Sequence, residues 1–354
     1  MNMIILQNTL FKPLAKWRYL SINRLGLFTA LLLLFLLSGC DKAPPSQTSL
    51  SQHRLVEGRL VDGALSKDGL LAVTLSLNGD VNVWDLVSKQ AFVTWRKADF
   101  NDDIYQLMLS GDKQYLLAAS QRQLFLLDVT TGERLLNWQA EAFNPDANIS
   151  SIHLNYSASQ ILVGMSDGSI NTVDRSSNSL SLFKQHSAEV SAVAFLSSSD
   201  QVLSTGHDGE LLIWATATGK VHRRFALPHR IMSLAIDSAN RRLFAADALD
   251  NHFIIDPESA SFSSMDALGA SVNLQYVERY RYFRRALFVK HGNMLITATS
   301  KQDMIGWDSQ SGAELVHWRL QAYSASTSVT AMAVNGEGQL VTLSSDGAIE
   351  LWPL

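Results

Sequence analysis

Residues 186–214 read HSAEVSAVAFLSSSDQVLSTGHDGELLIW, and this stretch contains three apolar runs separated by short polar turns. The runs are VSAVAFL (190–196), QVLSTGH (201–207) and LLIWAT (211–216), the last of which continues two residues past the stretch. Short runs of this composition, broken by Gly, Asp and Ser, are typical of β-strands, whereas helices need longer stretches with a period near 3.6. The stretch therefore predicts three successive strands of one sheet.

The last of these runs belongs to a series of seven similar endings. They read VNVWDL, LFLLDV, INTVDR, LLIWAT, FIIDPE, MIGWDS and IELWPL, with key positions Trp84, Leu127, Val173, Trp214, Ile255, Trp307 and Trp352. The spacings between key positions are 43, 46, 41, 41, 52 and 45 residues. A repeat of this length with several short strands in each copy predicts a β-propeller. The repeat indicates a framework and does not by itself identify a ligand.

Each period also contains a fourth strand-like run, except the last. These runs are QAFVTW (90–95), RLLNW (134–138), SLFK (181–184), VHRRF (221–225), SFSSM (261–265) and ELVHWRL (314–320). The sequence given stops at Leu354, directly after the third strand of the seventh period, and an unpaired sheet edge there favours aggregation. The run from His53 to Glu57 can supply the missing strand. We therefore expect an all-β fold over residues 52–354: a seven-bladed propeller of four-stranded antiparallel blades, closed by an N-terminal strand.

The fourth period resembles the WD-repeat family of β-propellers, and the other periods resemble it less completely. In that family a His, a Ser or Thr, an Asp and a Trp form a hydrogen-bonded relay within a blade, and the matching positions here are His186, Ser204, Asp208 and Trp214. Parts of the pattern remain as Trp84 with Thr74, and as Trp352 with Thr342 and Asp346. The resemblance implies a structural relay and a framework for protein–protein interaction.

Two sequence patterns invite a catalytic interpretation. Residues 164–168, GMSDG, match the nucleophile elbow G-x-S-x-G, but that motif requires a turn from a strand to a helix, whereas this segment lies between two predicted strands. Ser204, His186 and Asp208 also have the residue types of a catalytic triad, and the relay explains the same residues with Trp214 as the fourth member. The nine histidines lack metal-ligand spacing, and the chain has neither phosphate-binding glycine motif. We expect no catalytic residue, no metal and no cofactor.

The first forty residues predict export and lipidation. Residues 1–39 carry basic side chains and no acidic one, then an apolar run, Leu27 to Leu37, that is short for a membrane span. The segment Leu37-Ser38-Gly39-Cys40 resembles a bacterial lipobox, in which the cysteine thiol is lipidated and the cysteine becomes the mature N-terminus, and Cys40 is the only cysteine of the chain. A transmembrane anchor that ends in a stray cysteine is the alternative. Residues 40–51, with two adjacent prolines, are predicted to be a lipidated tether.

The resemblance to lipoproteins extends to sorting. It implies a protein of the bacterial envelope that faces the periplasm, and Asp41 resembles the signal that retains lipoproteins in the inner membrane. The net charge of the exported part bears on the kind of partner that it could bind. Without residues 1–39 the chain is acidic, so a nucleic acid is not expected as a ligand.

The longest interval, 52 residues, contains DALGASVNLQYVERYRYFRR (266–285), which we interpret as an insertion before the first strand of blade six. Arg and Tyr are enriched at binding hot spots. The candidate partner-binding residues are Tyr276, Arg279, Tyr280, Arg281, Tyr282, Arg284 and Arg285. A solvated loop or an extension of a strand edge is the alternative. Residues 216–290 hold eleven Lys and Arg against seven Asp and Glu, so blades five and six could face an acidic partner or anionic lipid headgroups.

Together these features predict a non-catalytic scaffold that binds other proteins and is held at a membrane by Cys40. One alternative is an envelope assembly factor, because LFLLDVTTGERLLNW (124–138) resembles repeats of the quinoprotein-type propeller of outer-membrane protein insertion, which usually has eight blades. A second alternative is a propeller hydrolase or lyase with its site in the central channel. That alternative would need converging carboxylates or histidines on the innermost strands, which consist mainly of Ala, Ser, Val, Leu and Met, with His153 and Asp237 isolated.

Overall fold

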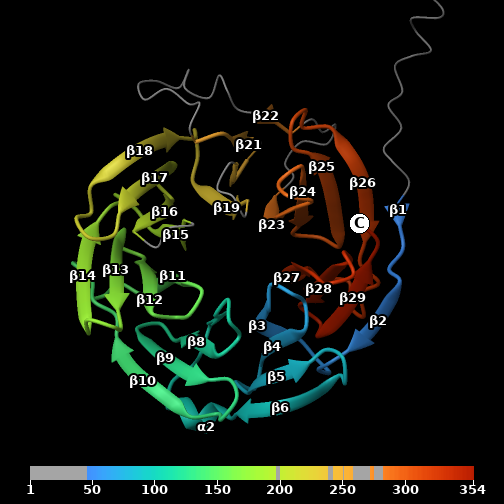
Figure 1. Cartoon of the computed structure of the whole chain (residues 1–354), viewed down its shortest axis with the longest axis horizontal. Helices are drawn as coiled ribbons and strands as arrows, with labels where there is room; N and C mark the ends of the chain where they lie inside the picture. The colour runs from blue at the N-terminus through green and yellow to red at the C-terminus, as the bar shows by residue number, and fades with distance from the viewer. Residues whose placement is uncertain (1–45, 197–199, 238–241, 250, 258–271, 275–281) are drawn as a thin grey trace, which may run out of the picture. The chain divides into compact units, whose positions relative to one another are not determined.

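A computed structural model describes residues 46–196, 200–237, 242–249, 251–257, 272–274 and 282–354. These residues form seven sheets arranged as the blades of a propeller (Figure 1). The single helix among them is the short α2 (Lys97–Phe100), between blades one and two. No helix in the described part of the chain combines the length and the apolar composition that crossing a membrane requires. The prediction of an all-β, seven-bladed propeller is confirmed.

The first four blades follow one another along the chain, each with its first strand innermost. Blade one is β3 (Leu60–Leu65), β4 (Leu71–Ser76), β5 (Val81–Asp85) and β6 (Gln90–Trp95). Blade two is β7 (Gln106–Leu109), β8 (Tyr115–Ala119), β9 (Gln123–Asp128) and β10 (Arg134–Gln139). Blade three is β11 (Ile149–Leu154), β12 (Gln160–Met165), β13 (Ser169–Asp174) and β14 (Ser179–Lys184). Blade four is β15 (Val190–Phe195), β16 (Gln201–Gly206), β17 (Glu210–Ala215) and β18 (Val221–Ala226).

The last three blades contain the departures from this plan. Blade five is β19 (Ile231–Ile236), β20 (Leu243–Asp247), β21 (His252–Ile255) and the two-residue β22 (Val272–Asn273). Blade six is β23 (Phe283–Val289), β24 (Met294–Thr299), β25 (Asp303–Asp308) and β26 (Glu314–Arg319), with β1 (Ser46–Gln47) as a fifth strand. Blade seven is β27 (Val329–Val334), β28 (Leu340–Ser344), β29 (Ala348–Trp352) and β2 (Ser51–Arg54).

The innermost strands close the ring. Each first strand contacts the first strand of the next blade, from β3 through β7, β11, β15, β19 and β23 to β27, and β27 contacts β3 again. The chain itself completes the circle at blade seven, where β2 pairs antiparallel with β29, His53 opposite Ile349. The closing strand was predicted at 53–57 and lies at 51–54, two to three residues earlier.

One strand was not predicted. β1 pairs in parallel with β26, Ser46 opposite His317 and Gln47 opposite Trp318, on the outer edge of blade six (Figure 1). These two residues were predicted to belong to the tether. Ser and Gln have no strong preference for strands, and pairing with a strand far along the chain produces no local sequence pattern. The folded body therefore includes Ser46, whereas the sequence-based boundary was residue 52.

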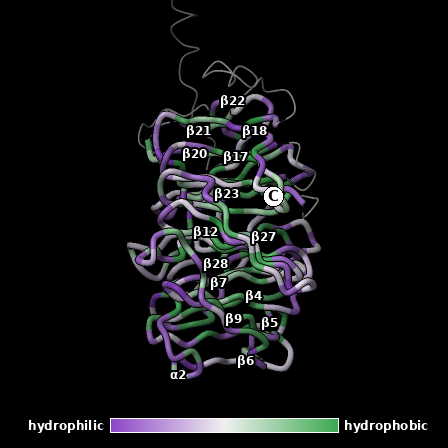
Figure 2. Tube along the Cα trace, turned by 90° about the vertical axis from the view of Figure 1, so that its left-hand side faces the viewer, coloured by the Kyte–Doolittle hydropathy of each residue, from purple (hydrophilic) through white to green (hydrophobic). Residues whose placement is uncertain are grey.

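The hydrophobic core lies between the blades. Between blades one and two, for example, Val73 and Val83 pack with Leu116 and Phe125, all of them fully buried. Burying each such side chain is worth roughly 1.5–3 kcal/mol, so every blade is stabilised mainly by its two neighbours. In Figure 2 the hydrophobic residues lie along the strands, and many of the hydrophilic residues lie in the segments that join them.

Alternating strand direction gives the ring two different faces. The connections between consecutive blades and the turns between second and third strands lie on one face, which we call the connection face. The opposite face carries the turns between first and second strands and between third and fourth strands. Six of the seven first strands have a bulge near their start, at Leu60/Asp62 and at the corresponding positions of blades three to seven. A bulge re-aims the side chains beside it, and Asp62, Ser150, Ser191, Arg285 and Thr330, which lie at or beside these bulges, line a cavity at the channel mouth on the connection face.

Candidate functional site

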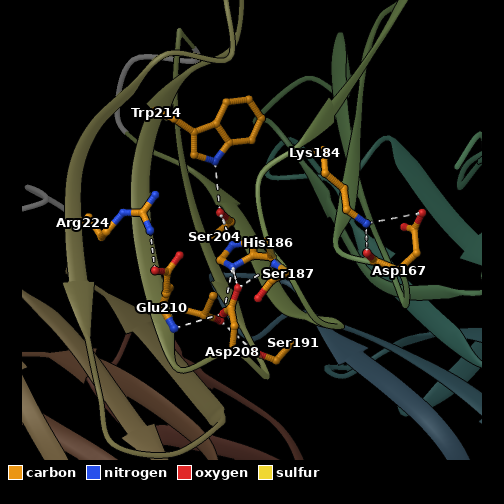
Figure 3. Close-up of polar contacts among 11 residues, drawn as sticks. Asp167, Lys184, His186, Ser187, Ser191, Ser204, Asp208, Glu210, Trp214 and Arg224 are labelled. Carbon is orange, nitrogen blue, oxygen red and sulfur yellow. Dashed lines mark hydrogen bonds and ion pairs between the residues drawn. The ribbon is translucent and has the colours of Figure 1, made fainter. Parts of the chain in front are cut away.

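Four residues of blade four form a continuous series of hydrogen bonds (Figure 3). His186 lies before β15, Ser204 in β16, Asp208 in the following turn and Trp214 in β17. His186 Nδ1 lies 3.1 Å from Asp208 Oδ2, and His186 Nε2 lies 2.9 Å from Ser204 Oγ. Trp214 Nε1 donates to Ser204 Oγ at 3.1 Å. The structure thus brings together all four residues that the resemblance assigned to the relay.

A neutral imidazole satisfies every group in this series. With its proton on Nδ1, His186 donates to Asp208, and its bare Nε2 accepts from the Ser204 hydroxyl, which in turn accepts from Trp214. Burial lowers the pKa of His186 and outweighs the opposing effect of Asp208. Burial alone would raise the pKa of Asp208, but the backbone N–H of Glu210 and the His186 ring hold it below its usual value. The pair is therefore a neutral histidine beside an ionised carboxylate.

The relay does not have the accessibility that a catalytic triad needs. His186 is 2% exposed, and Ser204 and Trp214 are fully buried. The hydroxyl of Ser204 is held between His186 and Trp214, so a substrate cannot approach it without breaking the blade. This geometry supports the structural interpretation of the triad-like residues.

The same cluster includes a set of metal-ligand atoms. His186, Asp208 and Glu210 each place one such atom within 4.8 Å of the others. Both ring nitrogens of His186 are already hydrogen bonded, and Arg224 forms an ion pair with Glu210. A metal would have to displace these partners, so the residues fit the relay better than they fit a metal centre.

Three other blades keep a shorter version of the relay. Trp84 Nε1 donates to Thr74 Oγ1 at 2.9 Å, and Trp352 Nε1 donates to Thr342 Oγ1 at 3.0 Å. A third pair, in which Trp307 Nε1 donates to Thr297 Oγ1 at 2.8 Å, was missed by our sequence analysis. The signal that could have found it is the constant spacing of ten residues between hydroxyl and indole, which blade four shares.

The G-x-S-x-G match is a turn between two strands. β12 ends at Met165, β13 begins at Ser169, and the N–H of Gly168 donates to the carbonyl of Met165. Gly168 has a φ of +89°, and a Cβ there would lie 2.2 Å from the carbonyl oxygen of His186. The glycine is therefore required by the backbone conformation and by the close approach of the next blade.

A polar cavity of about 570 Å³ lies at the channel mouth on the connection face. Its charged residues are Asp62 of blade one and Arg285 of blade six. Asp62 Oδ1 lies 3.9 Å from Arg285 Nη2, Asp62 Oδ2 accepts the N–H of Leu107 at 2.8 Å, and Arg285 Nε donates to the carbonyl of Thr330 at 2.6 Å. These contacts link blades one, two, six and seven around the mouth.

Asp62 is half-buried, whereas Arg285 is exposed at the channel mouth. Desolvation raises the pKa of Asp62, and Arg285 together with two backbone N–H groups offsets only part of the increase. Asp62 does not belong to a recognisable sequence motif, and it was not among the predicted site residues. Arg285 was predicted as a partner-binding residue on an insertion, but it lies in the innermost strand β23 and faces the channel.

The placement of the insertion itself was wrong. β22, at Val272–Asn273, falls inside the stretch 266–285 and is the fourth strand of blade five, paired with β21. Along the chain the extra residues therefore fall between β21 and β22 and not in the connection to blade six, and residues 258–271 lie outside the described residues. The fourth strand predicted at 261–265 lies outside the described residues, as do Tyr276, Arg279, Tyr280 and Arg281.

The described basic residues of blades five and six are spread over the molecule. Arg242 donates to Ser309 of the next blade's turn, Arg285 lies in the channel, Lys290 lies in a turn of the opposite face, and Arg284 is exposed in β23. Tyr282 is half-buried immediately before β23. Arg241, Arg279 and Arg281 lie outside the described residues. The described members do not form one continuous surface.

Exposed apolar side chains are more numerous on the connection face. There they are Val61, Leu77, Tyr105, Phe143, Leu249 and Tyr323, and on the opposite face they are Leu70, Val87 and Tyr156. Tyr105 also lines the channel mouth. Exposed aromatic residues around a rigid cavity are typical of protein-binding surfaces.

Comparison with known proteins agrees with the blade architecture. Residues 177–215 match the family model described as WD domain, G-beta repeat. The matched segment begins two residues before β14 and ends with β17, so it contains the outer strand of blade three, three strands of blade four and the complete relay. A search of curated proteins gave no match.

Proposed function

We propose that this chain, a WD-repeat β-propeller, is a non-catalytic scaffold that binds other proteins and is held at a bacterial membrane by a lipid on Cys40. The observation that carries the scaffold proposal is that the triad-like residues are buried and hydrogen bonded within a blade. Ser204, His186 and Asp208 are hydrogen bonded to one another inside blade four, which leaves them a structural role.

The connection face is the proposed binding surface. It combines exposed Tyr105, Phe143 and Tyr323 with the polar channel mouth. Because the inner strands form a closed ring, the loops on this face are held by a rigid framework, and little conformational entropy is lost when a partner binds. Arg284 is retained as a candidate contact, because it is exposed beside the channel.

The anchor is proposed from the sequence. Cys40 is the only cysteine, it follows Leu37-Ser38-Gly39, and the apolar run before it is short for a membrane span. Periplasmic location follows from this reading, and Asp41 favours the inner membrane. A lipid anchor would raise the local concentration of the scaffold near membrane-bound partners.

Of the alternatives, the assembly factor of quinoprotein type loses support from the blade count. Such propellers usually have eight blades, and the described residues form seven sheets. A hydrolase or lyase would place its acid and base in the channel. Asp62 is the carboxylate that lines the cavity at the connection-face mouth, and it is already occupied by Arg285 and the N–H of Leu107.

Two measurements test the proposal separately. Mass spectrometry of the intact protein should find a chain that begins at Cys40 and carries lipid, and a Cys40→Ala variant should carry none; a wild-type chain without lipid would contradict lipidation. Capture of partners by the intact chain should fail in a Tyr105→Ser, Phe143→Ser variant and persist in a matched Val87→Ser, Tyr156→Ser variant of the opposite face. Equal capture by both variants would contradict the assignment of the binding face.

A further inference from the structure

The pairing of β1 with β26 fixes where the proposed tether leaves the propeller. Ser46 lies opposite His317 and Gln47 opposite Trp318, so the chain joins the body on the outer rim of blade six (Figure 1). We define this rim by β26 (Glu314–Arg319) and β1. β2 then follows on blade seven, where the N–H of Leu50 donates to the carbonyl of Leu351 at 2.7 Å. The two strands hold the N-terminal segment to two adjacent blades.

A buried carboxyl group adds to this attachment. Glu350 is almost completely buried in β29, and its Oε2 accepts the N–H of Gln321 at 3.1 Å. Burial raises the pKa of Glu350, and the hydrogen bond from the N–H of Gln321 offsets part of the increase. Gln52 of β2 donates to the carbonyl of Gln321. The N-terminal segment is therefore tied to the connection between blades six and seven.

The tether is short compared with the body. Six residue steps separate Cys40 from Ser46, and an extended chain spans at most about 20 Å over that length. A compact body of roughly 300 residues has a radius of gyration near 19 Å, which corresponds to a diameter of about 50 Å. A lipid on Cys40 would thus keep the rim of blade six close to the bilayer. The opposite rim, at blades two and three, could lie up to about one body diameter farther from it.

Both faces of the ring are acidic. The acidic residues in the described connections and turns of the connection face are Glu57, Asp80, Asp99, Asp102, Asp103, Glu141, Asp146, Asp167, Glu189, Asp208 and Asp346. The basic residues there are Arg59, Arg96, Lys97, Arg122, Arg230 and Lys301. The basic residues in the described turns of the opposite face are Lys67, Lys89, Lys113, Arg175, Lys220, Arg242 and Lys290, and the acidic ones are Asp68, Asp112, Glu133, Asp200, Asp237, Asp256 and Glu337. Asp85, Asp128, Asp174 and Asp308 add to the acidic residues of the opposite face, because they end the third strands there and accept N–H groups of the turns that follow. An anionic membrane therefore repels both faces of the ring.

We infer that the propeller meets the membrane with the rim of blade six, so that the ring stands on edge, neither face lies against the lipid, and the rim of blades two and three is farthest from it. This inference rests on the proposed lipidation of Cys40. The rim of blade six also exposes Leu315 and Arg319, an apolar and a basic side chain that suit the boundary between headgroups and acyl chains. The arrangement presents the proposed binding face to partners in the periplasm.

Fluorescence quenching can measure this orientation. Because Cys40 is the only cysteine, a second cysteine in the folded body can be labelled without competition from any other residue of the propeller. The lipidated full chain would carry a dye at Leu315→Cys on the rim of blade six, Leu136→Cys on β10 of blade two, or Phe143→Cys on the connection face. All three residues are exposed in the native chain. The protein would be placed in vesicles of phosphatidylethanolamine and phosphatidylglycerol with a headgroup quencher.

We expect strong quenching at position 315 and at least several-fold weaker quenching at positions 136 and 143. Equal quenching at 315 and 136 would mean that the propeller lies flat, and strongest quenching at 143 would mean that the connection face meets the lipid. Either result overturns the inference. Arg319→Cys replaces the first probe if Leu315→Cys does not fold.

Two controls separate this inference from the proposed function. If the wild-type chain carries no lipid, which mass spectrometry of the intact protein reveals, the proposed anchor fails before any orientation is measured. If the chain is lipidated, a flexible Gly/Ser insertion between Lys42 and Ala43 should reduce the difference between positions 315 and 136. A difference that does not change with tether length would show that the short tether does not set the orientation.

Discussion

The carboxylate of Asp62 in blade one lies 3.9 Å from the guanidinium of Arg285 in blade six, across the mouth of the central channel. Blade seven lies between these two blades, and Arg285 also donates to the carbonyl of Thr330 in blade seven. Asp62 in turn accepts the N–H of Leu107 in blade two. One half-buried acidic group thus joins non-neighbouring blades, and its substitution should affect the whole ring.

Two substitutions of Asp62 should distinguish its role as acceptor for the N–H of Leu107 from its role as a negative charge opposite Arg285. Asp62→Ala leaves the N–H of Leu107 without its acceptor and should lower the free energy of unfolding by about 1–3 kcal/mol. Asp62→Asn keeps an acceptor, so it should cost much less. Urea denaturation at neutral pH measures both values. Equal losses in the two variants would show that the charge, and not the hydrogen bond, is what matters.

The raised pKa of Asp62 also predicts a pH dependence. The folded state favours the protonated carboxyl, so the contribution of this group to stability is fully present below about pH 4, the unfolded pKa, and is lost as pH rises through the folded pKa. Asp62→Asn should remove this component. If the difference in stability between Asp62→Asn and wild type did not change with pH, the assignment would be wrong.

Substitutions at Ser204 test whether the relay stabilises the folded protein. Ser204→Ala leaves the buried His186 Nε2 and Trp214 N–H without partners and should destabilise the protein by about 1–3 kcal/mol. Ser204→Thr should be close to wild type, because threonine occupies the same position at 74, 297 and 342, where it bonds the tryptophan ten residues later. Thermal unfolding compares the variants, and a harmless Ser204→Ala would contradict a structural role.

His153 should make the protein sensitive to acid. It lies near the channel mouth on the opposite face, where burial, with a smaller effect of Lys67, lowers its pKa to about 4. Its folded pKa is below its unfolded value, so stability is complete above about pH 6.5 and falls as pH drops toward 4, by at most about 3 kcal/mol. His153→Gln should flatten this dependence, whereas His222→Gln, exposed on β18, should leave it unchanged. Denaturation midpoints between pH 4 and 7 provide the measurement.

The closing strand predicts an effect of shortening the chain. Starting the folded body at Ser51 removes β1 and should cost little, because β1 contributes only two paired residues. Starting it at Val56 also removes β2, which exposes the edge of β29 and should produce aggregation. Light scattering during expression and refolding compares the two chains. A monomeric, stable protein without β2 would contradict closure by this strand.

The regular part of the fold could be predicted because its signals are local. The third strands end at tryptophan or aliphatic residues that fill the space between blades, so the spacing of Trp84, Trp214, Trp307 and Trp352 reveals the blades directly. The relay of His186 was predictable for the same reason, because all of its members lie within one repeat. Local hydrophobic periodicity and motif spacing contain this information.

What could not be predicted depends on contacts between distant residues. Asp62 and Arg285 meet only because the ring closes, and a parallel strand such as Ser46–Gln47 has no composition that distinguishes it from a linker. The fourth strand of blade five was misplaced because Val272–Asn273 is too short to form a recognisable pattern. These features belong to the assembled propeller and not to any single repeat.

The most direct test of the account is photo-cross-linking in intact cells with a photo-reactive amino acid at single positions of the full chain. Tyr105 and Phe143 report on the connection face, and Val87 and Tyr156, which are similarly exposed, report on the opposite face. The account predicts an adduct of the same mass at both connection-face positions and none at Val87 or Tyr156. Adducts only at Val87 or Tyr156 would contradict the proposal that the connection face binds the partner.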